Sequence, residues 1–270
     1  MIKYYGGKKW LSKLIKKYLP NCKKELFVDL FVGGGSISDC LCQEFTNTII
    51  NDKDNNLMNF YQCVKEYDID DLVRFFEGQR EKTTFDNVKE FRKRLDNDKL
   101  TNLERAFLYY SCVYCGYGGK PYASPTRDKF NQYKKRNIHK DLSLCKKTLS
   151  CCELHCEDYH NIKANNAFWY CDPPYAKVGD NTYYGIKGKS HKEFNHYDFF
   201  KYITEIAKDN LVMISYEDSE FIRKLYQGWN FIEIPKKTVN FNPNNKNNET
   251  LTTNELLITN YPTEKGGEKE

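Results

Sequence analysis

The segment FWYCDPPYAKVGD, residues 168–180, contains the residues whose types and order most clearly suggest chemistry. An aromatic, apolar run, which predicts a strand, ends in Asp172, Pro173, Pro174 and Tyr175. Each proline fixes φ and removes a backbone donor, and each residue before a proline is extended, so the strand must continue as a stiff loop. The Asp172 carboxylate and the Pro173 carbonyl then form a fixed pair of acceptors beside an aromatic ring. Such a pair suits a flat molecule that carries an amino group.

A glycine-rich turn in DLFVGGGS, residues 29–36, is a second candidate site. It follows the apolar run 25–31, and this order predicts a buried parallel strand, a turn and a helix. Gly33 and Gly35 would let the backbone approach a ligand closely, although a simple tight turn is the alternative. The turn matches neither the dinucleotide fingerprint nor a phosphate loop, so we expect it to face something other than a phosphate.

Asp52 follows a further strand-like run, residues 48–50. An acid at this place accepts the two ribose hydroxyls of an adenosine in nucleotide-binding α/β folds. The alternative is that Asp52 caps a helix that begins near Asn55. Three features together fit S-adenosylmethionine, which has an adenosine but no phosphate. They are a turn that lacks a phosphate-binding motif, an acidic residue placed to bind a ribose, and the proline-locked strand end.

The remaining patterns predict the elements that position these residues. Segment 9–18 has helical spacing, 211–216 reads as a strand, and NFIEIP and NELLITNY predict an antiparallel pair around an asparagine-rich loop, 240–254. Residues 56–149 are helical in pattern and basic. Strands at both ends of the chain with a helical block between them predict one α/β domain with a large insertion.

The charge is unevenly distributed along the chain. Residues 80–150 hold 17 Lys and Arg against 8 Asp and Glu, which makes +9 and leaves −4 for the rest of a chain whose total is +5. This excess is either a solvated helical surface or a footprint for phosphates. No apolar stretch is long enough to span a bilayer, and eleven cysteines without a secretory signal indicate reduced thiols. We therefore expect a cytoplasmic protein, which includes the nucleoid or the host cytoplasm of a virus.

The motifs YYGGK, FVDLFVGGGS, NDKD and CDPPY, in this order and with the insertion before the last, resemble the Dam-like (D12 class, alpha group) DNA adenine-N6 methyltransferases. The resemblance covers nearly the whole chain. It implies a Rossmann-like, S-adenosylmethionine-dependent methyltransferase domain made of residues 1–55 and 150–262. A mainly helical target-recognition domain, 56–149, would be inserted into it, and 263–270 would form a flexible tail.

The resemblance also implies which residues hold the cofactor. Lys8 would face the carboxylate of the cofactor, Phe31 would line its pocket, and Asp158 in CEDY would contact its adenine. Without the family, Tyr4 would be an N-terminal anchor and Lys8 a surface charge. The full set of expected cofactor contacts is Tyr4, Lys8, Phe31, Gly33, Gly35, Asp52, Asp158 and Asp172.

The expected reaction moves a methyl group to N6 of an adenine that has been flipped out of the duplex. Asp172 and the Pro173 carbonyl would accept the two N6 hydrogens, and Tyr175 would stack on the base, which Tyr183 or Tyr184 could also hold. Cytosine-N4 methylation by the same loop is the nearest alternative. Cytosine carbon methylation is excluded because it needs a Pro-Cys nucleophile, and no proline here precedes a cysteine.

Double-stranded DNA is the expected partner, bound by a monomer that could form a dimer on DNA, with no membrane involved. Segment 114–136 interleaves basic, aromatic and glycine residues, as nucleic-acid-binding surfaces do, although a solvated hairpin is the alternative. The candidate DNA contacts are Lys120, Arg127, Lys134, Lys135, Arg136 and Tyr184. The run GYGGKPY departs from the family pattern, so no recognition sequence is assigned. A solitary enzyme, half of a restriction–modification pair and a viral protein all fit the sequence.

A zinc-stapled nucleic-acid-binding module without catalysis is the alternative from a different class. Its ligands would come from a C-x-x-C pair and a downstream cluster, namely Cys112, Cys115, Cys151, Cys152, His155 and Cys156. The first pair lies in the apolar run AFLYYSCVYC, where cysteines pack as small hydrophobic side chains. We therefore expect no metal.

Overall fold

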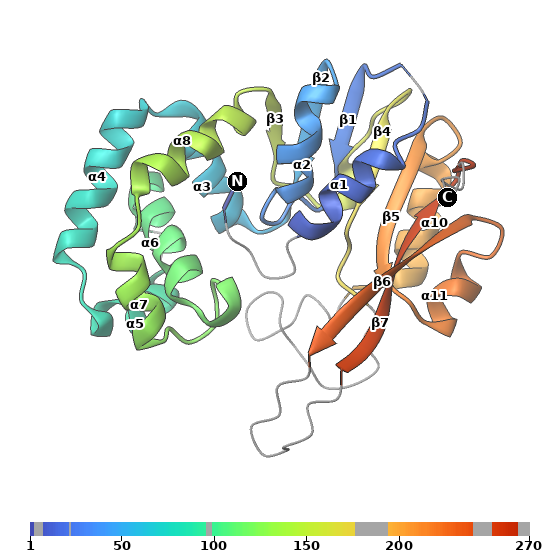
Figure 1. Cartoon of the computed structure of the whole chain (residues 1–270). Coiled ribbons are helices and arrows are strands. Elements are labelled where there is room, and N and C mark those ends of the chain that lie inside the picture. The colour runs from blue at the N-terminus through green and yellow to red at the C-terminus, as the bar shows by residue number, and fades with distance from the viewer. Residues whose placement is uncertain (3–7, 22, 96–98, 176–193, 240–249, 264–270) are drawn as a thin grey trace, which may run out of the picture.

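The computed structural model describes residues 1–2, 8–21, 23–95, 99–175, 194–239 and 250–263 (Figure 1). These residues form one seven-stranded sheet with the strand order β3-β2-β1-β4-β5-β7-β6. The strands are β1 (Leu26–Asp29), β2 (Asn47–Asn51), β3 (Cys152–His155), β4 (Phe168–Cys171), β5 (Leu211–Glu217), β6 (Asn230–Val239) and β7 (Thr250–Thr259).

The direction of the strands marks where a ligand would bind. Strands β3, β2, β1, β4 and β5 are parallel, whereas β7 is antiparallel to both β5 and β6. The strand order reverses between β1 and β4, and open α/β sheets bind ligands at the carboxyl ends of the strands beside such a reversal. Both the glycine turn after β1 and the proline-locked loop after β4 start at this point.

These strands confirm the predicted Rossmann-like α/β fold and its closing antiparallel pair. Two details of the prediction were wrong. The sequence analysis did not predict β3, whose run CELH is short and contains a glutamate and a histidine. It also extended the asparagine-rich loop to Asn254, whereas β7 begins at Thr250. The intervening residues 240–249 lie outside the described part of the chain.

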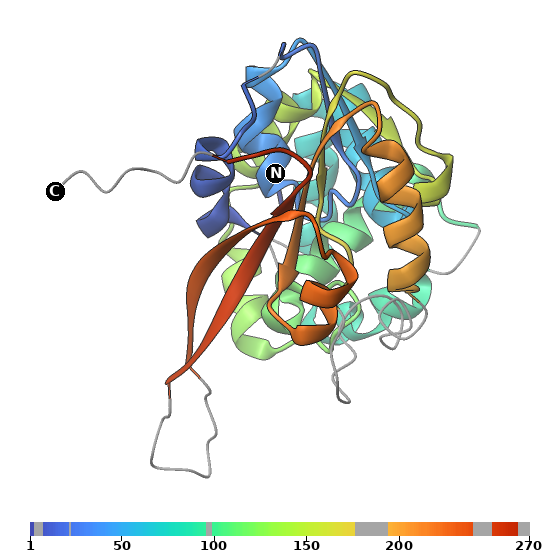
Figure 2. The ribbon, with the colours of Figure 1, turned by 90° about the vertical axis from the view of Figure 1, so that its right-hand side faces the viewer.

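Successive side chains of the central strands point to opposite faces of the sheet, and helices pack on both faces. Phe168 and Tyr170 of β4 pack with α1 (Lys9–Lys17) and α2 (Ser36–Leu41). Trp169 and Cys171, one residue on in each case, pack on the opposite face with α10 (His196–Ile206) and α11 (Glu220–Leu225). Figure 2 shows α1 and α10 on opposite sides of the sheet. Because both faces of the central strands are covered, we expect a site at the edge where the strands end.

A block of helices lies beside the β3 edge of the sheet (Figure 1). Its members are α3 (Asn55–Glu66), α4 (Ile69–Lys82), α5 (Phe85–Arg94), α6 (Asn102–Cys115), α7 (Arg127–Lys134) and α8 (Ile138–Leu149). Each begins after a side-chain N-cap, such as Thr101, whose hydroxyl accepts from the backbone N–H of Glu104. The helical pattern predicted for this segment is confirmed.

The apolar core of the helical block continues into the sheet domain. Ile50 of β2 and Val32 of the glycine turn belong to the same buried cluster as Phe60 of α3 and Tyr110 of α6. The division into a catalytic domain and a separate recognition domain 56–149 therefore stays a prediction. Within the described ranges, no helix has the length and apolar character needed to cross a bilayer.

The proposed zinc ligands are not brought together. Cys112 and Cys115 are buried in α6, where burial raises the pKa of the Cys115 thiol to about 12. Nowhere in the described part of the chain do three or more His, Cys, Asp or Glu side chains form a group that could hold a metal ion. The first cysteine pair thus packs as part of the helical core.

Candidate active site

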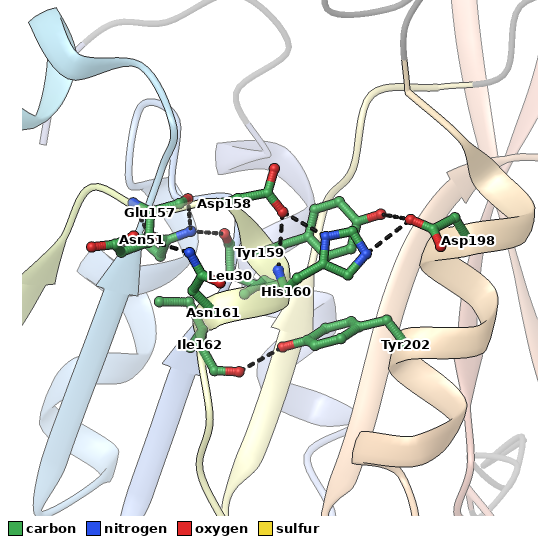
Figure 3. Close-up of polar contacts among 10 residues, drawn as sticks. All are labelled: Leu30, Asn51, Glu157, Asp158, Tyr159, His160, Asn161, Ile162, Asp198 and Tyr202. Carbon is green, nitrogen blue, oxygen red and sulfur yellow. Dashed lines mark hydrogen bonds and ion pairs between the residues drawn. The ribbon is translucent and has the colours of Figure 1, made fainter.

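Asn51, the last residue of β2, connects three loops at the carboxyl edge of the sheet (Figure 3). Its amide nitrogen donates to the carbonyl oxygens of Leu30 (3.2 Å) and Glu157 (3.1 Å), and its amide oxygen accepts from the Glu157 backbone N–H (3.0 Å). Because Asn51 is buried, its amide needs hydrogen-bond partners within the protein. The turn after β1 and the loop after β3 supply them. The sequence analysis did not identify this residue.

The Asp52 carboxylate is held at the glycine turn. Its Oδ2 accepts from the backbone N–H of Gly33 at 3.0 Å, and its Oδ1 accepts from that of Asp54 at 2.9 Å. Burial raises the pKa of Asp52, while these backbone donors oppose the rise. Asp54, and not Asp52, caps α3, so the capping alternative for Asp52 is wrong.

The glycines of the turn adopt conformations that few other residues could. Gly33 and Gly35 have φ values of 46° and 67°, in the left-handed region that favours glycine. A Cβ at Gly35 would lie 2.2 Å from Cε of Met1, so at Gly35 the close approach is to the N-terminal residue. The Gly33 carbonyl accepts from the Tyr61 hydroxyl of α3 at 2.7 Å, which ties the turn to the helical block.

Phe31 lies in an aromatic cluster next to this turn. Its ring centroid is 5.5 Å from that of Phe199 and 5.9 Å from those of Tyr159 and Phe194. Phe31 is only partly buried, and it lies two residues before Gly33, whose backbone N–H donates to Asp52. The role of Phe31 in the cofactor pocket stays a prediction.

Asp158 and Asp198 hold His160 between them (Figure 3). Oδ1 of Asp158 is 2.6 Å from Nδ1 of His160, and Oδ2 of Asp198 is 2.8 Å from Nε2. Burial would raise the pKa of Asp158, but the hydrogen bonds from the His160 backbone and ring outweigh it and the pKa is lowered. Since Asp198 also accepts from the Tyr159 hydroxyl at 3.0 Å, the loop after β3 is fastened to α10.

The proline-locked end of β4 places Asp172 among donors. Oδ1 of Asp172 lies 3.0 Å from Nζ of Lys8 and accepts from the Ser215 hydroxyl of β5 at 2.9 Å. Ser215 also contacts the Tyr170 hydroxyl at 2.9 Å. Among the residues that the structure describes, none donates to Oδ2 of Asp172. One carboxylate oxygen is therefore fixed by two donors, and the other keeps its acceptor capacity.

Lys8 joins this carboxylate to a second one. Its Nζ lies 3.0 Å from Oε1 of Glu255 in β7 and also donates to the Tyr175 hydroxyl, which in turn donates to Glu255. Burial lowers the pKa of Lys8, but the charges of Asp172 and Glu255 and their hydrogen bonds outweigh burial, so the pKa is raised. Lys8 is thus a buried, charged residue. The sequence analysis did not identify Glu255 or Ser215.

The basic residues predicted to contact DNA differ in their exposure and in their contacts within the protein. Lys120 is buried, whereas Arg127 and Lys135 are exposed, with the Arg127 guanidinium 4.7 Å from the Phe85 ring centroid. The Lys134 ammonium donates to the carbonyl oxygens of Arg80 (2.6 Å) and Thr83 (3.2 Å) at the end of α4.

Arg136 forms two hydrogen bonds with Asp141, at 2.7 and 2.8 Å, and lies over the Tyr114 ring at 3.9 Å. Lys134 and Arg136 therefore have contacts within the protein. The DNA roles of these basic residues stay predictions, and Tyr4, Tyr183 and Tyr184 lie outside the described residues.

The described chain has a Rossmann-like fold with acidic and aromatic side chains near the point where the strand order reverses. The chain matches the family model of the D12 class N6 adenine-specific DNA methyltransferases over residues 4–240 and belongs to that family. It is therefore a transferase that acts on N6 of adenine in DNA, and its family implies S-adenosylmethionine as the methyl donor. A search of curated proteins found no match.

The family decides between the alternatives that the sequence left open. Adenine, and not cytosine N4, is the methylated base of this family. The non-catalytic zinc-stapled module is wrong on two grounds, because the family consists of enzymes and because the described cysteines and histidines form no metal-binding group.

Proposed function

We propose that this protein transfers the methyl group of S-adenosylmethionine to an adenine flipped out of double-stranded DNA, at the end of β4. One observation carries the proposal. Oδ1 of Asp172 is fixed by Lys8 and Ser215, while Oδ2 has no donor among the described residues. A preorganised acceptor at a rigid, proline-locked strand end suits an exocyclic amine, because no side chain must be reorganised when the amine arrives.

The residues near the reversal of the strand order fit the cofactor. Asp52 accepts from two backbone N–H groups and still has lone pairs for ribose hydroxyls. Phe31 supplies an apolar surface, and Asp158, about half exposed, has an oxygen for the amine of the cofactor adenine. When bound, S-adenosylmethionine supplies an electrophilic methyl group on a sulfonium. We propose that Lys8 serves to bind Asp172 and Glu255, which it contacts, and that it does not bind the carboxylate of the cofactor.

The residues at the end of β4 make the amine more nucleophilic. The lone pair of adenine N6 is delocalised into the ring, so the amine is weak until its geometry changes. Acceptance of its two hydrogens by Asp172 and the Pro173 carbonyl favours a pyramidal nitrogen with a localised lone pair. The nitrogen becomes acidic only after it has accepted the methyl group, so Asp172 need not be a strong base. Most of the rate then comes from positioning and fixed dipoles.

Tyr175 is held where it could stack on the flipped base. Its hydroxyl is tied to Lys8 and Glu255, and its ring centroid lies 6.0 Å from that of Tyr216. Flipping costs a few kcal/mol, which stacking and hydrogen bonds in the pocket must offset. Pro174 keeps the loop between Asp172 and Tyr175 extended, so both side chains keep a constant spacing.

The helical block, 56–149, is the part that we propose reads the DNA sequence. The excess of positive charge in residues 80–150 supports this role. Arg127 and Lys135, which are exposed, are the basic side chains best placed for phosphates. We further propose a cytoplasmic enzyme that is a monomer in solution and could form a dimer on DNA.

Labelled methyl transfer tests the proposed function. Purified protein is incubated with methyl-labelled S-adenosylmethionine and unmethylated DNA of mixed sequence, and the DNA is digested to nucleosides. The label should appear in N6-methyl-2′-deoxyadenosine alone, and mapping of the modified sites in undigested DNA should give one short sequence. Label in N4-methyl-2′-deoxycytidine, or no incorporation by folded protein that binds DNA, would contradict the proposal.

A further inference from the structure

Glu255 is a buried carboxylate that the proposed reaction does not use. It lies on β7, is 1% exposed, and is joined through Lys8 to Asp172 at the end of β4. A carboxylate is costly to bury unless it is paired and hydrogen-bonded. Glu255 has both kinds of partner, because its Oε1 lies 3.0 Å from Nζ of Lys8 and accepts from the Tyr175 hydroxyl.

Glu255 shares the Lys8 ammonium with Asp172. An ammonium has three N–H donors, and here their partners are Asp172, Glu255 and the Tyr175 hydroxyl. Counted over these side chains alone, the two carboxylates and the ammonium sum to one net negative charge. Without Glu255, the positive charge of Lys8 would act on Asp172 alone, and the cluster would be neutral.

The sign of this charge matters to the reaction. Nitrogen N6 gains positive charge as it accepts the methyl group, so a nearby anionic cluster stabilises the transition state more than the ground state. A low-polarity surrounding strengthens the effect, and Lys8, Glu255 and neighbouring Tyr170 are all buried.

We infer that Glu255 is a positioning residue for methyl transfer, an inference that rests on the proposed function. It holds the Lys8 ammonium and the Tyr175 hydroxyl, and through Lys8 it keeps Asp172 an effective acceptor. The alternative is that the Lys8–Glu255 pair only attaches the N-terminal segment to the sheet. If Glu255 is a positioning residue, its negative charge contributes to the rate of methyl transfer. If it only attaches the N-terminal segment, the rate does not depend on that charge.

Substitutions of Glu255 separate charge from shape. Glu255→Gln keeps the size and the acceptor oxygen but removes the charge, whereas Glu255→Asp keeps the charge and shortens the side chain. In single-turnover transfer with saturating donor and DNA, Glu255→Gln should be about 10- to 100-fold slower, with both dissociation constants nearly unchanged. Glu255→Asp should be faster than Glu255→Gln by about fivefold or more.

A double-mutant cycle tests whether Glu255 acts through Lys8. If it does, Glu255→Gln should slow transfer much less in the Lys8→Met background than in the wild type, because no ammonium is left for Glu255 to hold and offset. Losses that multiply would overturn the inference. So would a Gln variant as fast as wild type or as the Asp variant, or a Gln variant that fails to fold by circular dichroism while Lys8→Met folds.

A matched control lies on the neighbouring strand. Glu233 of β6 is exposed and pairs with Arg223 at 2.6 Å, and Glu233→Gln should leave the transfer rate unchanged. The wild-type protein separates the two proposals. If it transfers no methyl group, the proposed function fails, whereas if it is active and Glu255→Gln is equally active, only the role of Glu255 fails.

Discussion

At the residue scale, the candidate site contains three acids whose surroundings differ. Asp52 accepts from two backbone N–H groups, and Asp172 accepts from Lys8 and Ser215. Asp29, at the end of β1, is 2% exposed and accepts from the Ser38 hydroxyl at 2.5 Å. Burial, aided by the nearby charges of Asp172 and Asp52, raises the pKa of Asp29 to about 7.

The pKa of Asp29 predicts a pH dependence of stability. Because the pKa in the folded state lies above that in the unfolded state, the fold binds a proton that the unfolded chain has released. The free energy of unfolding should therefore fall as pH rises from about 4 to 7 and level off above that, with a loss of about 2 kcal/mol between pH 5.5 and 8. Asp29→Asn should lose less over the same interval. Urea denaturation at both pH values measures this, and equal losses in the two proteins would contradict it.

Asp52 should matter for the cofactor and not for DNA. In Asp52→Asn one oxygen still accepts a backbone N–H, but the charged acceptor for the ribose hydroxyls is lost. The dissociation constant for S-adenosylmethionine should rise about 10- to 100-fold, as expected when a hydrogen bond to a charged group is removed. Calorimetry measures this, with Asp86→Asn on the exposed surface of α5 as the control. An unchanged dissociation constant would exclude Asp52 as the ribose acceptor.

At the element scale, the sequence predicted the elements that have a strong local signal. Glycine and proline fixed the turns after β1 and β4, and apolar runs marked β1, β4 and β5. Strand β3 was missed because an edge strand of four residues needs little apolar character. Its strand conformation depends on pairing with β2, which the sequence of the segment does not reveal. Ser215 and Glu255 were missed because their roles depend on partners that are 43 and 80 residues away along the chain.

Two adjacent lysines at the end of α7 illustrate the same limit, because the sequence analysis gave both the same role, DNA binding. Lys134 donates to carbonyl oxygens at the end of α4, whereas Lys135 is exposed. Lys134→Met should lower the free energy of unfolding by about 1 kcal/mol, because these hydrogen bonds and the favourable interaction with the helix end are lost.

Lys135→Met is the matched control for stability and the test for DNA binding. It should leave the free energy of unfolding unchanged, weaken DNA binding and reduce the slope of log affinity against log salt by about one. Equal destabilisation by both substitutions, in urea denaturation, would contradict the capping role of Lys134.

At the scale of the whole molecule, the site is assembled from parts that are far apart in the chain. Lys8 comes from the N-terminal segment, Asp172 from the centre of the sheet, and Glu255 from the last strand. The helical block meets the same edge of the sheet through Tyr61 and the glycine turn. This assembly brings the proposed cofactor residues and the proposed amine acceptor to the carboxyl edge of a single sheet, and Tyr61 ties the helical block to the glycine turn there.

Methyl transfer by Asp172→Ala is the most direct measurement of the central claim that Asp172 presents an acceptor to adenine N6. With labelled donor and DNA in excess, the variant should bind DNA like the wild type and form N6-methyl-2′-deoxyadenosine about 1,000-fold more slowly or not at all. A variant that folds and methylates adenine within about threefold of the wild-type rate would contradict the claim, because a preorganised acceptor cannot be worth so little.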